Sequence, residues 1–174
     1  MSNDSRRLLE RYCRDGDQAS FSVFYRAQAD RLWRYLRLRG CAPEPAYDLL
    51  AEAFLRFIRV ICRDPRQPVA LLYRIAVNLQ IDAWRRQQAS LEQPAAATDP
   101  EPAATAVTDD REYVRKLLRV LPPDEQNLLL LRYWIGLTHK EIAGMLEKPE
   151  GTIRRQCAGA LETLRRRWRE ELHG

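Results

Sequence analysis

The sequence lacks long hydrophobic runs, and it contains little cysteine, histidine or glycine. The longest uninterrupted apolar run is only a few residues, as at 128–131, whereas a membrane-spanning helix needs about 20. The first eleven residues are polar and charged, without the apolar core or the cleavage site of a secretory signal. We therefore expect a cytoplasmic protein with no membrane insertion.

The cysteines are widely spaced and form no Cys-x-x-Cys pair, and the only histidines are His139 and His173. A zinc site needs ligands clustered at short spacing, so we expect neither a metal nor another cofactor. Free thiols are the common state in a reducing cytosol. We therefore expect free thiols at all four cysteines, which are Cys13, Cys41, Cys62 and Cys157.

Motifs of catalysis are missing as well. The chain has only 7 Gly, with no glycine-rich phosphate loop, no Gly-x-Ser-x-Gly turn and no recognisable catalytic carboxylate pair. We therefore expect that the protein is not an enzyme.

The charged residues that are present are biased towards arginine. Of the 29 basic residues 26 are Arg, and the net charge is +5. The planar guanidinium suits phosphates and guanine edges, so this bias is compatible with nucleic-acid binding. A GC-rich coding sequence also raises the Arg content, and composition alone leaves both explanations open.

The charge is unevenly distributed along the chain. Residues 1–90 carry a net charge of +6, residues 91–110 carry −5, and residues 111–174 carry +4. The middle segment has three prolines, many small residues and no amphipathic period. This composition predicts an acidic flexible linker between two basic domains.

Both flanking domains have helical periodicity. In the first, apolar residues recur at three- and four-residue spacing over 21–38 and 46–61, and a third helix is predicted over 69–87. Period-two alternation is scarce, so no strands are predicted and the fold class is all-α. Breaks before the second and third helices are predicted at Pro43, Pro45, Pro65 and Pro68.

The second domain has the pattern of a helix-turn-helix. One helix ends near Leu121, and another is predicted over 124–135, with Gly136 as its stop. Thr138 can cap a short helix, with Glu141 at the capping-box position. A tight turn at 147–149 then leads into a long helix through residue 168, which completes the arrangement.

The predicted last helix has two faces. Its exposed face suits a major groove, because small residues lie beside arginines there, and the first turn, with Thr152, could hold a phosphate. A solvated face is the alternative, and the helix-turn-helix context favours DNA. The predicted core face is Ile153, Cys157, Ala160, Leu161, Leu164 and Trp168, and the exposed face is Gly151, Arg155, Ala158 and Gly159, flanked by Arg154 and Gln156.

The helix predicted over 46–61 also has two faces. Leu55 lies among Asp48, Glu52 and Arg59, and an apolar side chain ringed by charge is typical of a protein-docking surface, although one exposed leucine is ordinary. The predicted core face is Ala46, Leu49, Leu50, Ala53, Phe54, Phe57, Ile58 and Ile61.

The third predicted helix is apolar nearly all round, with a narrow polar edge of Arg74, Asn78 and Arg85. Tyr73 and Trp84 lie nearby, and a basic edge with aromatics suits unpaired bases. A core helix with solvated arginines is the alternative, and the residues alone favour it.

Three co-linear motifs resemble extracytoplasmic-function (ECF, group IV) sigma factors of the sigma-70 family. They are Ala46-Tyr-Asp-Leu-Leu-Ala-Glu-Ala-Phe-Leu-Arg-Phe-Ile-Arg59, Leu72-Tyr-Arg-Ile-Ala-Val-Asn-Leu-Gln-Ile-Asp-Ala-Trp-Arg-Arg86, and a region from Leu121 that includes Gly-Leu-Thr, Glu-Ile-Ala and Gly-Thr-Ile-Arg154. The resemblance covers nearly the whole chain and implies a dissociable subunit that directs RNA polymerase to promoters.

The resemblance implies a role for each part of the chain. Residues 1–90 would be sigma region 2, a helical bundle, and residues 111–174 would be the region 4 helix-turn-helix, with 91–110 as the linker. Implied partners are the β′ clamp and β subunit of core RNA polymerase, promoter DNA and an anti-sigma factor. The implied polymerase-binding residues are Asp48, Leu49, Glu52, Leu55, Arg56 and Arg59. The implied −10 residues are Arg63, Arg66, Arg74, Asn78, Arg85 and Arg86, and the implied −35 residues are Thr138, Lys140, Thr152, Arg154, Arg155, Gln156 and Gly159.

The sequence departs from the family pattern in two places. The turn Glu147-Lys-Pro149 replaces a common Gly-Ile-Ser, which predicts a left-handed non-glycine residue at a cost of ~1 kcal/mol. The stretch 157–160 replaces a segment that often carries His-Arg, which predicts an altered −35 specificity.

Two other functions compete with a sigma factor. One is an ordinary helix-turn-helix regulator, and the other is an interaction protein that has the sigma fold but sequesters a partner. The motifs at 46–59 and 72–86 favour the sigma factor over the regulator, because a regulator needs no polymerase-binding helix.

Overall fold

The computed structural model describes residues 2–91, 114 and 116–173, so the predicted linker lies outside the described residues except for Leu91. The chain divides into two compact units, 1–103 and 104–174. The described residues contain helices and no strand, and the two helical domains of the predicted all-α fold are confirmed. No described helix is both long enough and apolar enough to span a bilayer, and the described residues contain no cluster of metal-ligating side chains.

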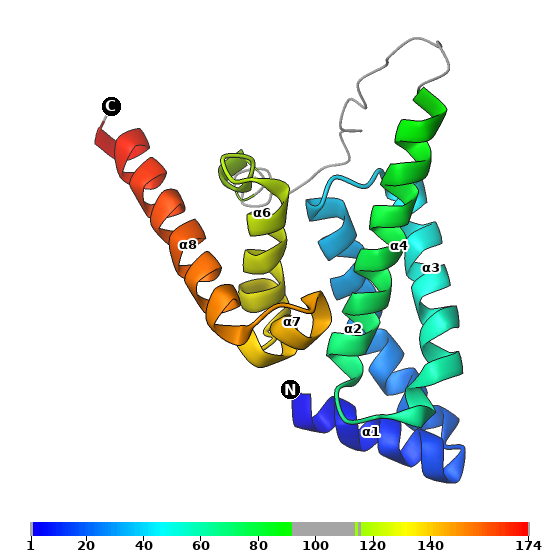
Figure 1. Cartoon of the computed structure of the whole chain (residues 1–174). Coiled ribbons are helices and arrows are strands. Elements are labelled where there is room, and N and C mark those ends of the chain that lie inside the picture. The colour runs from blue at the N-terminus through cyan, green and yellow to red at the C-terminus, as the bar shows by residue number, and fades with distance from the viewer. Residues whose placement is uncertain (1, 92–113, 115, 174) are drawn as a thin grey trace. The chain divides into compact units, whose positions relative to one another are not determined.

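The first unit is a bundle of four helices and one short turn of 3-10 helix (Figure 1). The helices α2, α3 and α4 pack side by side, and α1 crosses one end of the bundle. Pro43 and Pro68 stand at the first helical position of α3 and α4, where a missing N–H costs nothing. The elements are α1 (Ser2–Asp15), α2 (Gln18–Leu38), α3 (Pro43–Val60), η1 (Ile61–Arg63) and α4 (Pro68–Leu91).

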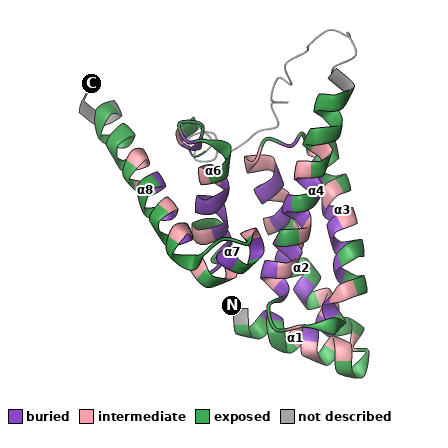
Figure 2. Cartoon of the chain, viewed as in Figure 1, coloured by how far each residue is buried: buried purple, intermediate pink, exposed green. Residues whose placement is uncertain are grey.

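Aromatic side chains from three helices form the core of this unit. Phe24 of α2 stacks on Phe57 of α3, with ring centroids 5.3 Å apart. Tyr35 of α2 meets Tyr73 of α4 edge to face at 5.2 Å. Each fully buried side chain of this size contributes about 1.5–3 kcal/mol through removal of apolar surface from water. These contacts fix which faces of α3 and α4 remain exposed (Figure 2).

Several details of this unit differ from the sequence predictions. Tyr73, which was expected beside the basic edge of α4, is fully buried against Tyr35. Helix α1 was not predicted, although Leu8, Leu9, Tyr12 and Cys13 recur at helical spacing; the stretch is short and mostly charged, and Leu9 is its only fully buried large side chain. Ile58 was placed on the core face of α3, but it is 38% exposed. The period of α3 puts Ile58 at the margin of its apolar stripe, where packing decides the outcome.

The prediction of free thiols at all four cysteines is wrong for two of them. Cys13 of α1 and Cys62 of η1 form a disulfide between residues 49 positions apart. The separation hides this pair from any spacing rule, and only the packing of α1 beside η1 brings the two sulfurs together. Cys41 and Cys157 are buried free thiols, as expected.

The described helical residues of the second unit begin at 114 and 116–118, where the helix predicted to end near Leu121 in fact ends at Leu118, and continue with α6 from Pro123. The helix predicted over 124–135 is in fact α6 (Pro123–Leu129) followed by the π-helix η2 (Leu130–Ile135). Gly136, with φ of 85°, ends it in the left-handed conformation. The short helix α7 (His139–Leu146) and the long helix α8 (Glu150–His173) complete the predicted helix-turn-helix.

The inner face of α8 is buried only over its first half. Ile153, Cys157 and Ala160 are buried as predicted, but Trp168 is 41% exposed. Helix α8 has 24 residues, which gives a length of about 36 Å, whereas α6 and α7, which pack against it, have 7 and 8 residues. Its C-terminal half is mostly exposed in Figure 2.

Candidate docking and nucleic-acid interfaces

The exposed face of α3 presents the residues expected to bind polymerase. Leu55 is 54% exposed, and Asp48 is exposed about two turns before it. Glu52 pairs with Arg56 at 2.6 Å, one helical turn apart. Leu49 is only half-buried, although it was also placed on the core face, and Arg59 is exposed.

The structure adds two apolar residues to this helix surface that the sequence analysis did not identify. Tyr47 is 60% exposed, although its ring lies 5.3 Å from that of Trp33. Ile58 is exposed as described above. The surface of α3 is therefore more apolar than the single leucine indicated.

A surface groove runs between α3 and α4, with a volume of about 340 Å³. Arg56 and Arg59 line it from α3, and Arg74 and Asn78 line it from α4, over a floor of Val60, Leu71 and Ile75. The structure thus brings together residues that were assigned to two different partners. Three guanidinium groups around an apolar floor provide a place where an anionic group with an apolar part can bind.

The connection from α3 to α4 carries Arg63 and Arg66, both exposed. Arg66 is paired with Asp64 through contacts of 2.7 Å to each carboxylate oxygen. The Arg66 side chain and backbone N–H hold the pKa of Asp64 down to about 2, and the charge of Arg6 in α1 makes a smaller contribution to the same shift. Arg66 is therefore charge-paired in the free protein, whereas Arg63 projects from η1.

The C-terminal end of α4 holds a second basic group. Arg85 and Arg86 are exposed there, about 10 Å along the helix axis from Asn78. Trp84 is 37% exposed, and the guanidinium of Arg39 lies over its ring at 5.3 Å. Arg39 and Trp84 are 45 positions apart, so no local pattern in the sequence indicates that they lie together.

A buried glutamine holds this cation–π pair in place. Gln80 has no exposed surface, and its Oε1 accepts a hydrogen bond of 2.8 Å from Arg39 Nε. Its Nε2 donates to Cys41 Sγ at 3.0 Å. Burial raises the pKa of the Cys41 thiol, so the sulfur stays neutral. Arg39 is thus fixed from below, and one face of Trp84 is covered.

The start of α7 has the predicted capping box. The Oγ1 of Thr138 accepts from the Glu141 backbone N–H at 3.2 Å, and the Thr138 backbone N–H donates to Glu141 Oε2 at 2.8 Å. The Thr138 hydroxyl also donates to that oxygen, so its proton is engaged within the protein. Lys140 is exposed on the same first turn.

The turn between α7 and α8 confirms the predicted left-handed residue. Glu147 has φ of 54° and ψ of 41°, a conformation that costs a side-chain-bearing residue about 1 kcal/mol relative to glycine. Among the described residues it is the only non-glycine with positive φ.

The outer face of α8 is open near its start. Arg155 and Gly159 are exposed, and Arg154 is paired with Glu150 at 2.8 Å. The backbone N–H of Thr152 already donates to the Pro149 carbonyl at 3.0 Å, so it is less available to a phosphate than was expected. Gln156 is half-buried, and its Oε1 is turned inward without a hydrogen-bond partner among the described residues.

Comparisons with known proteins agree with this arrangement. The family model for sigma-70 region 2 matches residues 24–90, and the model for sigma-70 region 4 matches residues 117–166. Together they cover about two thirds of the chain. The boundaries fall within the two helical units described above.

Individual relatives are similar over most of their length. The RNA polymerase sigma-E factor of Streptomyces coelicolor is 29% identical over 155 residues, which cover 86% of each chain. The ECF RNA polymerase sigma factor SigW of Bacillus subtilis is 28% identical over 174 residues, covering 89% of this chain and 92% of that protein.

Among solved structures, the sigma factor RpoE in complex with the anti-sigma factor NepR from Bartonella quintana has a similar fold. The TM-score is 0.63 at 17% identity, covering 84% of this chain and 94% of that one. The two sigma-70 regions occur in order, and each falls within one of the two helical units. The chain belongs to the sigma-70 family of RNA polymerase sigma factors and is of the ECF type.

Proposed function

We propose that this sigma factor is a group IV member that binds core RNA polymerase through α3 and recognises promoters through α4 and α8. The observation that carries the proposal is the order of the two basic units, a region 2 bundle and then a region 4 helix-turn-helix. The protein would act in the cytoplasm, where polymerase and DNA are found. The polymerase, and not this chain, would join the nucleotides.

The polymerase site is proposed on α3 at Asp48, Leu49, Glu52, Leu55, Arg56 and Arg59. The exposure of Leu55 and Ile58 supports it, because burying them against a partner removes apolar surface from water. The acidic side chains would fix the register on a basic partner surface. The β′ clamp is the proposed contact, and the β subunit is the proposed contact for the second unit.

Recognition of an unpaired −10 strand is proposed for two places on the first unit. One is the groove with Arg74 and Asn78, together with Arg63 and Arg66 in the adjoining connection, and the other is the end of α4 with Arg85 and Arg86. Guanidinium groups track phosphates, and an aromatic face such as that of Trp84 accepts a base.

The −35 element is proposed to lie against the start of α8 and the first turn of α7. Arg155 can reach a guanine edge, because Gly159 on the same face leaves room for the groove floor. Arg154, Thr152, Gln156, Thr138 and Lys140 are proposed as flanking contacts. The inward Oε1 of Gln156 would have to rotate outward to contribute.

An anti-sigma factor is proposed as an inhibitory partner. Two basic units that each seek nucleic acid would bind it promiscuously if left free. The complex of a sigma factor with NepR supports the idea for a similar fold. The exposed apolar residues of α3 are a suitable target, because covering them would also block polymerase.

The test first measures binding of the chain to core RNA polymerase. It then measures transcription in vitro from a promoter that becomes active when the chain is overexpressed. Reversal of Asp48 and Glu52 to Arg should weaken binding of core polymerase by more than about tenfold, or about 1.4 kcal/mol, with little change in melting temperature. A matched control reverses Glu10, which is half-buried on α1, and Asp30, which is exposed on α2, and should bind normally.

The same experiment separates the competing functions. An ordinary regulator would bind duplex DNA without polymerase, and a sequestering protein would bind polymerase or another partner without supporting transcription. A double reversal that binds core polymerase as well as the parent would contradict the assignment of α3.

A further inference from the structure

The disulfide joins the end of α1 to the connection between α3 and α4. Cys13 lies near the end of α1, and Cys62 lies in the middle of η1, the three-residue element that begins the connection from α3 to α4. Cys62 is exposed and Cys13 is half-buried, so small thiols and disulfides can reach the bond.

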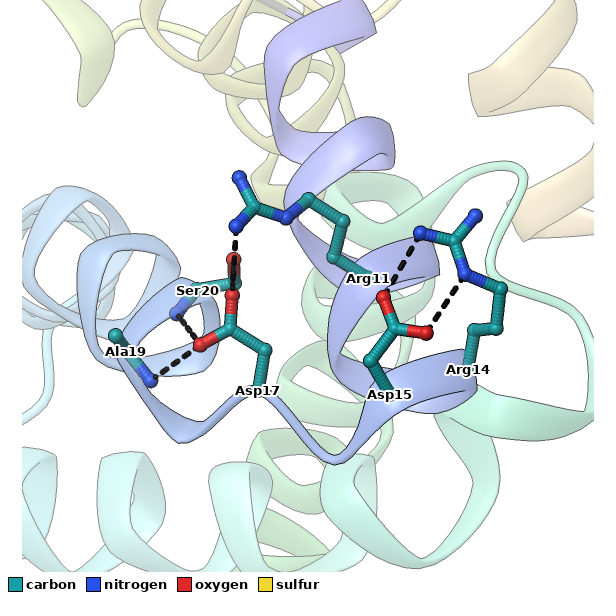
Figure 3. A network of polar contacts seen from close by, with 6 residues as sticks. All are labelled: Arg11, Arg14, Asp15, Asp17, Ala19 and Ser20. Carbon is teal, nitrogen blue, oxygen red and sulfur yellow. Dashed lines mark hydrogen bonds and ion pairs between the residues drawn. The ribbon is translucent and has the colours of Figure 1, made fainter.

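The α1 end of the bond is anchored. Figure 3 shows Asp17 between α1 and α2, accepting hydrogen bonds from the backbone N–H groups of Ala19 and Ser20 and from the Ser20 hydroxyl. The Arg11 guanidinium reaches the same carboxylate at 3.1 Å. Leu9 is fully buried beneath the helix. Cys13 therefore projects from a helix end that is fixed without the disulfide.

The other end begins at the fully buried Ile61, which is packed beside α1 and α3, and continues into an exposed stretch whose residues are proposed to contact the −10 strand. After Cys62 come Arg63, Asp64 and Arg66. Asp64 and Arg66 bond to each other, and the charge of Arg6 in α1 also acts on Asp64. These side chains are exposed. The disulfide therefore adds a covalent cross-link between this connection and α1.

We propose that Cys13 and Cys62 form a thiol–disulfide exchange site through which low-molecular-weight disulfides of the glutathione class increase promoter opening. The inference rests on the proposed role of the η1 connection in −10 binding. A connection already held by the disulfide loses less conformational freedom when it binds a single strand, and pre-organisation of this kind strengthens binding.

The exchange takes place in two steps between the cysteine pair and a small disulfide, RSSR. The thiolate of Cys62 attacks one sulfur of the disulfide RSSR, which forms a mixed disulfide and releases one RS⁻. Cys13 then loses its proton, attacks the Cys62 sulfur and releases the second RS⁻. The two cysteines give up two electrons and RSSR becomes two RSH, while an excess of a dithiol runs the same steps in reverse.

The other two cysteines are poorly suited to this chemistry. Burial raises the pKa of both the Cys41 and Cys157 thiols, so the reactive thiolate is disfavoured. Both are also shielded from solvent. Exchange is therefore confined to the exposed pair, and Cys41→Ser is a suitable control, because a hydroxyl there can still accept from Gln80.

The experiment compares holoenzyme made with the chain oxidised by glutathione disulfide and with the chain reduced by dithiothreitol. Promoter opening is followed by permanganate reactivity of unpaired thymines. Opening should be about fivefold faster or more with the oxidised chain. Cys13→Ser and Cys62→Ser should both open at the slower rate under either condition, whereas Cys41→Ser should keep the difference.

A second measurement, made on the free chain, tests the exchange site without relying on the proposed function. Hydrogen exchange at 61–67 should be slower in the oxidised chain, and alkylation should label the pair only after reduction. Equal exchange in both states, or equal or faster opening with the reduced chain, would overturn the proposal. Absence of opening in both states, with slowed hydrogen exchange intact, would instead contradict the role in −10 binding.

Discussion

At the scale of single residues, Glu147 shows how a local requirement of the fold can oppose the residue that occupies it. The turn between α7 and α8 needs a left-handed residue so that the two helices can cross, and Glu147 adopts it with φ of 54°. A side chain with a Cβ is strained in that conformation, whereas glycine is not. The strain lowers the stability of the second unit, and a single substitution can restore what is lost.

Glu147→Gly should raise the free energy of unfolding of the second unit by about 1 kcal/mol, because the strain of the left-handed conformation is relieved. Urea denaturation of the full chain measures the change. Lys148→Gly is the matched control, since Lys148 lies next in the turn and has no positive φ, and it should give no gain. Equal effects of the two substitutions would contradict the argument.

Arg155 and Arg166 lie eleven positions apart on α8 and differ in what surrounds them. Arg155 stands beside small residues near the start of the helix, where base edges are reachable. Arg155→Ala should relax selectivity at one −35 position by ~1–3 kcal/mol. Arg166→Ala should weaken all sequences alike and flatten the salt dependence, as expected of a phosphate contact.

The measurement is transcription by holoenzyme across a library of single-base −35 variants. A uniform loss for Arg155→Ala would mean that this residue contacts phosphate only. Arg166→Ala serves as the comparison, because it removes the same charge from the same helix.

At the scale of elements, the junction of α1 and α2 depends on one carboxylate. Asp17 is the N-cap of α2, and hydrogen bonds from the Ser20 hydroxyl and the Ser20 backbone N–H lower its pKa. Arg11 adds an ion pair from α1. A carboxylate whose pKa is lower in the folded state contributes stability above its unfolded pKa, near 3.9, and loses it as the pH falls through the folded value.

Asp17→Ala should therefore lower the melting temperature at pH 7, and the difference from the parent chain should shrink as the pH falls below about 4. Thermal melts from pH 7 to pH 2 measure this. Asp30→Ala removes an exposed carboxylate paired one turn away with Arg34, and it should change the melting temperature little. A difference that stays constant with pH would show that the cap does not titrate as argued.

At the scale of the whole molecule, two separate units must act on one promoter. Each unit has its own core, and the segment that joins them lies outside the described residues. When two binding modules are joined without a fixed spacing, the second contact contributes little until something orders both. Core polymerase can fix the spacing of the two units by binding both.

The free chain should therefore bind promoter duplex weakly and with little sequence preference at physiological salt, and the holoenzyme should bind the same fragment specifically. Fluorescence anisotropy with promoter and scrambled fragments measures both. Tight, specific binding by the free chain would favour an ordinary helix-turn-helix regulator. Measurements at two salt concentrations separate the phosphate contribution from base recognition.

The sequence by itself determined the helical class, the order of the two units and the helix-turn-helix, because these depend on local signals. The period of apolar residues in α2 and the reciprocal bonds of Thr138 and Glu141 act within a few positions. Local signals were weak for α1, a short and mostly charged stretch in which Leu8, Leu9 and Tyr12 are spaced as in a helix, and at Ile58, which lies at the edge of its stripe.

Only the tertiary structure decided which distant residues meet. It joined Cys13 to Cys62, placed Arg39 over Trp84, and set Arg59 and Arg74 along one groove. These partners are separated by 15 to 49 positions, so their proximity depends on how whole helices pack rather than on any period along the chain. Helix packing is decided by the complementary shapes of buried side chains, and that information is spread over the entire unit.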